Sequence, residues 1–513
     1  MIKNRAVAAL LKAWTLLRQA FNRQKIYEIL PAFLVWLTFV LAIVVSFARP
    51  LWAIVFIIIF DLLWLIRVYY LVIHLLASWI RFKHDAKISW LDELKTLPDK
   101  NWEDYCHLIF LPTYKEPYEV IDKTFDALAK VNYPTHKFLL VLAGETRDRN
   151  NFLDVAERLN QKYGHKFLKI LVTLHPQNLA DEIPGKGSNI NYAGHQAQKL
   201  IDELKIPYEK IIVSSFDIDT CVYPDYFAYL TYKYITHPQP EHASFQPLAF
   251  YHNNIWESDP VTRVVANSTT FWLMTDLARN ERLFTFSSHS MSFNALVKVG
   301  FWEKNIVTDD SRIFLQCLLH YNGDYKVEPL YIPVSMNTVY MGHFWQSLKN
   351  QYKQMRRWAW GAEHIPYMLL NYPKHPRMPF KKKWYYLFNQ LEGVYSWATA
   401  PLLIFILGRL PLMLADKSEQ STMVAQNAPF ILEYLMNFAM IGLILSAIFS
   451  TLILPQKPKN KSWLYYPIMV LQWLLFPVTM IAFGSLPAID AQTRLMIGGK
   501  ARLGFWVTEK KSL

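Results

Sequence analysis

The chain has 513 residues, of which 52% are hydrophobic, 15% aromatic and only 19% charged, and its formal net charge is +13. This composition argues against an ordinary soluble protein and predicts segments embedded in lipid. The excess positive charge suits cytoplasmic loops, anionic headgroups and a phosphorylated substrate, and we expect no nucleic acid partner.

The N-terminal 80 residues are predicted to be membrane-associated. Residues 1–27 combine an apolar helical stripe with a basic face, which is typical of an interfacial helix on a cytoplasmic surface. Two transmembrane helices follow within 28–80, because 29–47 and 51–80 are each long enough to cross roughly 30 Å of hydrocarbon. The second contains Asp61, Arg67 and His74. Charges at that depth rarely face lipid, so we expect them to face other helices or a polar path.

Residues 81–340 have the composition of a soluble domain. The apolar runs HLIFLP, FLLVLA, FLKILVTL and KIIVSSFD alternate with helical patterns that follow Pro117, Asn150, Gly187 and Tyr223. This alternation predicts an α/β domain with a parallel sheet, and its ligands should bind beyond the carboxyl ends of the strands. The three cysteines of the chain are scattered and lack metal-ligand spacing, so no disulfide framework is expected.

The remainder of the chain is predicted to return to the membrane. Amphipathic interface helices are expected over 341–383, and 384–486 contains apolar stretches at 385–413, 430–454 and 463–486. The lysine-rich loop QKPKNKS should be cytoplasmic and DKSEQSTMVAQN should lie outside. Because the last stretch is broken by prolines, we favour a kinked segment in the interface, which keeps the basic tail 487–513 cytoplasmic.

Two acidic pairs are candidates for chemistry. Asp217 and Asp219 close the apolar run IIVSSFDIDT, where two carboxylates can grip a divalent ion or simply form a turn. Asp309 and Asp310 follow Thr308 and open a predicted helix, where acids suit the helix dipole. One of this second pair could also serve as a general base for an acceptor hydroxyl.

Three further motifs carry charge or aromatic surface. In QMRRW, Arg357 could bind a pyrophosphate and Trp358 could stack on a sugar ring, although arginines and tryptophans also mark helices at a membrane surface. GKGSN is a turn that offers Lys186 to a nucleotide. His289 in FSSHSMSF has no second ligand at suitable spacing and is read as a polar loop residue, not a metal ligand.

Taken in order, these motifs resemble those of the membrane-bound processive glycosyltransferases of family 2, which include the cellulose, hyaluronan, chitin and poly-N-acetylglucosamine synthases. LPTYKEP is similar to the first strand-loop of that family, GKGSN to its KAGN loop, FDIDT to its DxD, TDD to its TED and QMRRW to its QxxRW. FWVTEK near the C-terminus is similar to the FxVTxK gating loop of the cellulose synthase branch. The resemblance covers nearly the whole chain.

The resemblance implies a cytoplasmic, Rossmann-like GT-A domain inserted between the helices of a multi-pass protein of the cell (inner or plasma) membrane. It implies that Asp217 and Asp219 hold Mg²⁺ or Mn²⁺ and that Asp310, beside Asp309, is the base. The other residues that it assigns to the donor are Thr113, Tyr114, Glu116, Lys186, Arg357, Val507 and Thr508. Those that it assigns to the acceptor end are Gln354, Trp358 and His289.

One segment departs from the family pattern. Where the family usually has a pair of aspartates at the end of its second strand, this chain has LAGETRD. Either Glu145 or Asp148 is therefore expected to contact the nucleobase, and the identity of the nucleotide is less constrained than the transfer chemistry.

The resulting hypothesis is an inverting hexosyltransferase that uses a nucleoside diphosphate sugar, most simply a UDP-sugar, and extends a polysaccharide, with possible coupled translocation. The alternative is a distributive enzyme that adds one sugar to a lipid or to a surface glycan. A transporter or receptor with a binding-only domain is the third hypothesis, and it leaves the meeting of acidic pairs and a basic aromatic helix unexplained. The sequence leaves the sugar, the linkage and the oligomeric state open.

Overall fold

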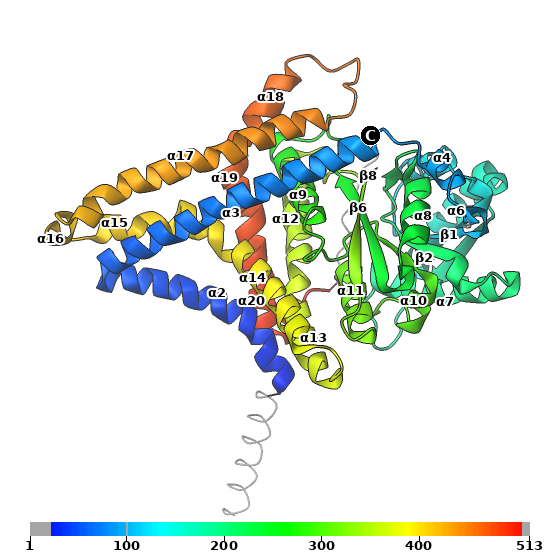
Figure 1. Ribbon diagram of the computed structural model, residues 1–513, viewed down its shortest axis with the longest axis horizontal. Coiled ribbons are helices and arrows are strands. Elements are labelled where there is room, and N and C mark those ends of the chain that lie inside the picture. Colours follow the sequence, from blue (N-terminus) through cyan, green and yellow to red (C-terminus); the bar gives the residue numbers. More distant parts are fainter. Residues whose placement is uncertain (1–21, 99–100, 505–513) are drawn as a thin grey trace, which may run out of the picture.

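The computed structural model describes residues 22–98 and 101–504. An α/β domain lies beside a set of long helices that project away from it (Figure 1). Most of the interfacial helix predicted over 1–27 falls outside the described residues, as do Val507 and Thr508 of the predicted gating loop.

The α/β domain is built on one sheet with the strand order β3-β2-β1-β4-β7-β6-β8-β5. Its strands are β1 (Cys106–Pro112), β2 (Phe138–Glu145), β3 (Lys169–His175), β4 (Ile211–Ser215), β5 (Cys221–Val222), β6 (Ala243–Phe250), β7 (Ser290–Ser292) and β8 (Lys326–Ser335). The four predicted apolar runs are β1 to β4, and these four strands are parallel as predicted.

The prediction of a parallel sheet is wrong for the other half. There β7 runs antiparallel to both β4 and β6, β8 runs parallel to β6, and β5 runs antiparallel to β8. The apolar pattern did not reveal these strands because β5 and β7 are only two and three residues long. In addition, Pro247 in β6 and two prolines in β8 make both runs unlike central strands.

The α-helices of this domain are α4 (Trp90–Lys95), α5 (Tyr118–Ala129), α6 (Arg149–Tyr163), α7 (Lys186–Leu204), α8 (Tyr226–Thr236), α9 (Pro260–Leu277), α10 (Phe293–Lys298), α11 (Asp309–His320), α12 (Phe344–Ala359) and α13 (His364–Asn371). Helices α5 to α11 lie between strands of the sheet in the chain, α4 precedes β1, and α12 and α13 follow β8. α5 to α8 begin within three residues of the positions where the sequence predicts helices, and α11 begins at the predicted Asp309.

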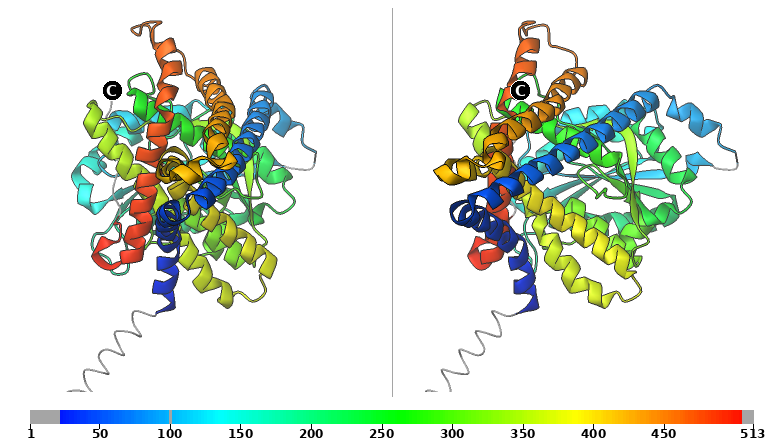
Figure 2. Two further views of the ribbon diagram at one scale, coloured as in Figure 1. Left: turned by 90° about the vertical axis from the view of Figure 1, so that its left-hand side faces the viewer. Right: turned by 60° about the vertical axis from the view of Figure 1, so that its left-hand side comes forward.

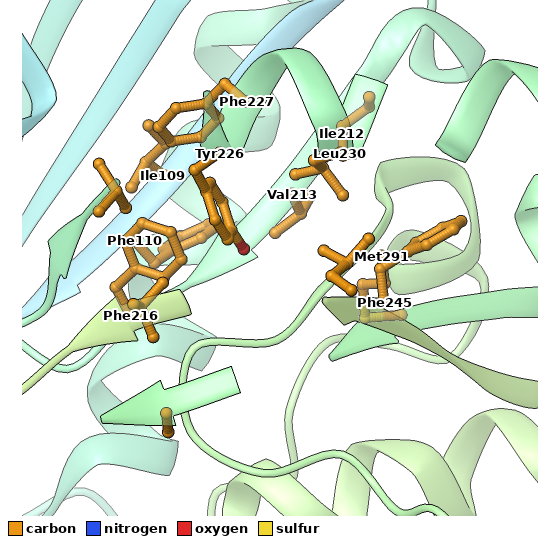
Figure 3. Close-up of a cluster of buried hydrophobic side chains, with 14 of the residues drawn as sticks. Ile109, Phe110, Ile212, Val213, Phe216, Tyr226, Phe227, Leu230, Phe245 and Met291 are labelled. Carbon is orange, nitrogen blue, oxygen red and sulfur yellow. The ribbon is translucent and has the colours of Figure 1, made fainter. Parts of the chain in front are cut away.

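The core of the domain forms where strands of both halves meet α8. Figure 3 shows Phe110 of β1 and Val213 of β4 packed toward Tyr226 and Phe227 of α8, with Met291 of β7 beside them. All of these side chains are almost fully buried. Each contributes roughly 1.5–3 kcal/mol by leaving water, so this core fixes the strand ends on which the site depends.

Four helices of the described residues are long and apolar enough to cross a membrane: α2 (Arg23–Ala48), α3 (Pro50–Asp85), α17 (Met423–Leu452) and the stretch Tyr465–Ile497. Phe380–Phe405 (α14) and Leu407–Leu414, which contains α15 (Leu410–Leu414), meet this criterion only as a pair bent by 45°. The segments predicted at 29–47, 51–80, 385–413, 430–454 and 463–486 correspond to these helices. α16 (Lys417–Gln420) links α15 to α17.

The last apolar stretch takes a different course from α3 and α17. It consists of α18 (Tyr465–Leu471), α19 (Phe476–Thr479), a π-helical turn at Met480–Ser485 and α20 (Leu486–Ile497). In Figures 1 and 2 it runs across α3 and α17, which lie alongside each other, and α20 packs against α2 and α12. This course is compatible with an interfacial segment, and its place relative to a bilayer stays a prediction.

Candidate active site

A cavity of about 890 Å³ begins at the carboxyl ends of the parallel strands and continues between the long helices. It is lined by residues from every predicted motif that the structure describes. These are Thr113, Tyr114, Glu116, Glu145, Lys186, Asp217, Asp219, Asp309, Asp310, Gln354, Arg357 and Trp358. These twelve predicted site residues therefore share one space, which His289 and Asp148 do not line.

The Lys186 ammonium joins three of the motifs. This residue begins α7, and its Nζ donates hydrogen bonds to Asp217 Oδ1 at 2.9 Å and to the Asp310 carboxylate oxygens at 2.8 and 3.0 Å. Burial alone would lower the pKa of Lys186, but the charges of Asp217, Asp310 and Asp309 outweigh it and raise that pKa above its ordinary value. One buried cation thus holds the end of β4 beside the start of α11.

Asp217 and Asp219 are oriented by neighbours from other parts of the domain. Asp217 Oδ2 accepts a hydrogen bond from Ser287 Oγ at 2.7 Å, and Asp219, only 2% exposed, accepts one from the Asn337 N–H at 2.8 Å. Carboxylate oxygens suit Mg²⁺ or Mn²⁺, and Mg²⁺ is commonly bound by one or two carboxylates and completed by substrate phosphates.

The carboxylates of Asp217 and Asp219 fit a metal ion whose remaining ligands come from the substrate. Among the described residues, no group of three or more His, Cys, Asp or Glu side chains is arranged to hold a metal by itself. An ion at Asp217 and Asp219 would therefore depend on oxygens of a bound diphosphate.

Asp309 and Asp310 occupy different environments although they are adjacent. Asp309 is 4% exposed, and within residues 22–98 and 101–504 its Oδ2 has no hydrogen-bond partner. Burial, followed by the neighbouring charge of Asp310, raises the pKa of Asp309 to about 7. Asp310 instead bonds Lys186, so the structure separates a buried acid from an ion-paired carboxylate.

The raised pKa of Asp309 predicts a pH-dependent stability difference. The unfolded Asp309 loses its proton near its ordinary pKa of 3.8 and the folded one near 7, so stability from the buried neutral acid falls as the pH rises through this window. We expect the apparent melting temperature of the wild type, relative to Asp309→Asn, to decrease by more than about 2 °C between pH 5 and 7.5 and then level off. A difference independent of pH would show that Asp309 is ionised in the folded protein.

Gly187 allows the GKGSN turn to approach the acidic pair. A Cβ at this position would lie 2.9 Å from the Glu303 carbonyl oxygen and 3.2 Å from Asp309 Cβ. We expect Gly187→Ala to destabilise the protein by about 1–3 kcal/mol, since the backbone of α7 must move away. Melting curves should show little change for Gly361→Ala, whose added Cβ meets its nearest atoms at 3.9 Å. Equal melting temperatures for the two variants would contradict the close approach.

The loop after β1 is held by its own acidic residue. Glu116 accepts hydrogen bonds from Thr113 Oγ1 at 2.8 Å and from the Tyr114 N–H. The Arg147 guanidinium lies 4.4 Å from the centre of the Tyr114 ring and pairs with Glu145. This arrangement places the Tyr114 ring and the carboxylates of Glu116 and Glu145 in one part of the cavity wall.

The two candidates for nucleobase contact differ in position. Glu145 is 5% exposed and lines the cavity. Asp148 accepts a hydrogen bond from the Lys115 N–H at 3.0 Å and so fixes the neighbouring loop. Glu145 is therefore the better placed of the two for a contact within the cavity.

The two arginines of the QMRRW motif on helix α12 have different surroundings. Arg357 and Trp358 line the cavity, and the Trp358 ring lies 5.6 Å from that of Phe286 and 6.1 Å from that of Tyr251. Arg356 instead pairs with Asp490 of α20 at 2.8 Å. The C-terminal stretch thus fixes the helix that presents Arg357 and Trp358.

His289 lies behind the catalytic candidates. Its side chain is fully buried, its Nδ1 is 3.0 Å from the Phe286 carbonyl oxygen and 3.7 Å from Asp310 Oδ1, and burial lowers its pKa. A contact between His289 and an acceptor stays a prediction, and Ser287 in the same loop is the residue that bonds Asp217.

Several polar residues of the cavity were missed by sequence reasoning. They are Ser287, Asp276, Arg279 and Arg282, together with Glu392, which does not line the cavity but accepts a hydrogen bond from Arg282. Their spacing contains no signal, because they lie in a loop, at the end of α9 and on α14, and only the fold brings them together.

Comparison with known proteins gives a family and a set of distant structural neighbours. Residues 212–486 match the model of the family described as Glycosyl transferase family group 2. No curated protein matches the chain significantly. The mannosyltransferase PcManGT from Pyrobaculum calidifontis, in complex with GDP-Man and Mn²⁺, is 14% identical over 75% of this chain and 99% of its own, with a TM-score of 0.43. S. aureus TarS 1–349 with UDP-GlcNAc is 14% identical over 66% and 90%, with a TM-score of 0.32.

Proposed function

Because the chain belongs to Glycosyl transferase family group 2, we propose that it transfers a hexose with inversion from a nucleoside diphosphate sugar, most simply a UDP-sugar, to a hydroxyl of a growing saccharide. Its α/β domain is of the GT-A class. The observation that carries the proposal is the meeting of Lys186, Asp217 and Asp310 at one buried ammonium within the cavity.

The proposed chemistry needs a general base beside the saccharide hydroxyl that receives the hexose. Asp310, oriented by its hydrogen bonds from Lys186, takes the hydroxyl proton as the oxygen attacks the anomeric carbon. The new C–O bond forms on the face opposite the diphosphate, whose bond to the sugar breaks with both electrons going to the phosphate oxygen. Burial raises the pKa of Asp309 to about 7, so this carboxyl is partly protonated near neutral pH and adds less negative charge beside Asp310.

The departing diphosphate needs positive charge. Lys186 and Arg357 line the cavity and can donate charge-assisted hydrogen bonds to its oxygens. A bound Mg²⁺ or Mn²⁺, held by Asp217 and Asp219, would neutralise further charge on the diphosphate. Ser287 and the Asn337 N–H keep those two carboxylates in place.

The acceptor is proposed to enter from the membrane side. Trp64, Trp272, Trp358 and Trp397 line the cavity as it passes from the sheet to the long helices, and such rings stack on sugars. This supports a saccharide acceptor and a polysaccharide product. Apolar side chains of α3 and α17 in the same wall favour the second candidate, transfer to a lipid-borne acceptor.

The product distinguishes these hypotheses. Purified protein in nanodiscs is supplied with a panel of radiolabelled UDP- and GDP-sugars, and products are separated by size and by partition into organic solvent. Polymer would support processive synthesis, and a single-sugar lipid would support distributive transfer. Absence of both products and of donor hydrolysis would reject an enzyme in favour of a binding protein.

A further inference from the structure

A second group of charges lies in the cavity, away from the carboxylates at the strand ends. Arg67 of α3 and Arg282 both pair with Glu392 of α14, the latter at 2.9 Å. Arg279 Nη1 lies 3.3 Å from Asp276 Oδ1. Apart from Glu392, these residues line the cavity where the α/β domain meets the long helices.

This group has more hydrogen-bond donors than acceptors. Three guanidinium groups, each with five N–H donors, face two carboxylates, one of them shared, and the Ser396 hydroxyl, which accepts from Arg67 at 3.3 Å. Arg279 is 5% exposed, and among the described residues its Nε has no hydrogen-bond partner. Asp61 also lines the cavity, but it lies six residues from Arg67 and so about 120° around α3. The arginine group therefore carries unused capacity for an anion.

The adjoining wall has the opposite chemistry. It is apolar on both of the helices that lie side by side, α3 and α17, and is formed by Leu65, Val68, Leu71, Val72 and Leu75 together with Leu435, Met436, Ala439, Met440, Gly442 and Leu443. The hydroxyl of Ser446, also in this wall, is used within α17 by a 2.9 Å bond to the Gly442 carbonyl oxygen. Met440 is 44% exposed, so this wall continues to the outer surface of the helices.

We propose that the acceptor is carried on an anionic lipid, whose phosphate binds to Arg67, Arg279 and Arg282 and whose hydrocarbon chain lies along α3 and α17. The inference rests on the proposed function and names the class of its acceptor. Guanidinium groups bind phosphate through paired N–H donors, and hydrocarbon suits a wall of Leu, Val and Met side chains. For a neutral polysaccharide, the cavity-lining side chains of α3 and α17 that can form hydrogen bonds are Asp61, Trp64, Arg67 and Ser446, and the others are apolar.

The test uses a pair of photoactivatable probes that bear the same sixteen-carbon diazirine chain, one with a phosphate and one with a neutral glucoside headgroup. After irradiation of the purified full-length protein, we expect the phosphate probe to label peptides of α3 around Val68 and of α17 around Met440. Labelling by the glucoside probe should be about tenfold weaker, as should labelling of Arg279→Gln by the phosphate probe, since a charge-assisted bond is worth at least ~1.4 kcal/mol.

Two further variants separate charge from folding. Arg279→Lys retains the positive charge but not the paired N–H donors, so it should recover part of the labelling, whereas a merely structural role for the guanidinium would leave it as weak as Arg279→Gln. Arg158→Gln, on α6 and half exposed, is the matched surface control and should be labelled like the wild type.

Three outcomes would overturn the inference. Equal labelling by both probes would show an apolar surface without headgroup selection. If inorganic phosphate at micromolar concentration abolished labelling by the phosphate probe, the arginine group would be a site for free phosphate. If only peptides outside α3 and α17 were labelled, the lipid would not bind in the cavity. UDP binding, measured on the same samples, separates the two proposals. If the wild type does not bind UDP, the proposed function is rejected. If it binds UDP but does not distinguish the two probes, only the lipid acceptor is rejected.

Discussion

Replacing Asp310 with Asn is expected to lower hexose transfer by about 100-fold or more, because the amide keeps the size of the side chain but cannot accept the hydroxyl proton. Donor binding should persist. The amide oxygen in Asp310→Asn can still accept a hydrogen bond from Lys186, which bonds both Asp310 oxygens in the wild type. UDP-sugar affinity, measured by equilibrium binding, should stay within about threefold, a change below about 1 kcal/mol.

The adjacent acid supplies the matched control for this prediction. Asp309 is buried and lacks a hydrogen bond at Oδ2 within the described part of the chain, so Asp309→Asn should retain far more transfer than Asp310→Asn. If Asp309→Asn were inactive and Asp310→Asn active, Asp309 would be the base and Asp310 would not. Activity in both variants would remove this acidic pair from the chemistry.

The half of the fold that carries the donor motifs was accessible to sequence reasoning because local rules apply there. β1, β2 and β4 are buried parallel strands of five or more residues, which appear as continuous apolar runs, and the edge strand β3 is apolar enough to be recognised although it is mostly not buried. The helices that carry Lys186 and Asp310 begin at recognisable motifs. Since the carboxyl ends of parallel strands meet at one edge, motifs far apart in sequence were expected to converge, and Lys186 with Asp217 and Asp310 does so.

The acceptor half was not accessible in the same way. Ser287 bonds Asp217 from a loop two residues before His289, and nothing in FSSHSM distinguishes one polar side chain from the next. Arg67 was expected to face other helices, but its partner Glu392 lies 325 residues away and depends on how α3 and α14 pack. Such contacts are properties of the tertiary arrangement and leave no periodic trace in the chain.

The second large effect is expected at the other acidic motif. Asp219→Asn removes a negative charge from a 2% exposed position while leaving an oxygen that can accept the Asn337 N–H, so the fold should be retained. If Asp217 and Asp219 hold the ion of the diphosphate, this variant should lose about 100-fold or more of donor turnover, because the leaving group keeps its charge.

Metal dependence of UDP binding provides the decisive measurement for Asp219. In the wild type, removal of divalent ions with EDTA should weaken UDP binding by about tenfold or more, which corresponds to ~1.4 kcal/mol, and added Mn²⁺ should restore it. In Asp219→Asn the UDP affinity should already be low and should respond little to EDTA or Mn²⁺. Asp324→Asn, which alters a 66% exposed carboxylate outside the cavity, should behave like the wild type. If Asp219→Asn responded to Mn²⁺ like the wild type, the Asp219 carboxylate would not hold the ion. A site that depends on two carboxylate ligands must weaken when one of them is neutralised.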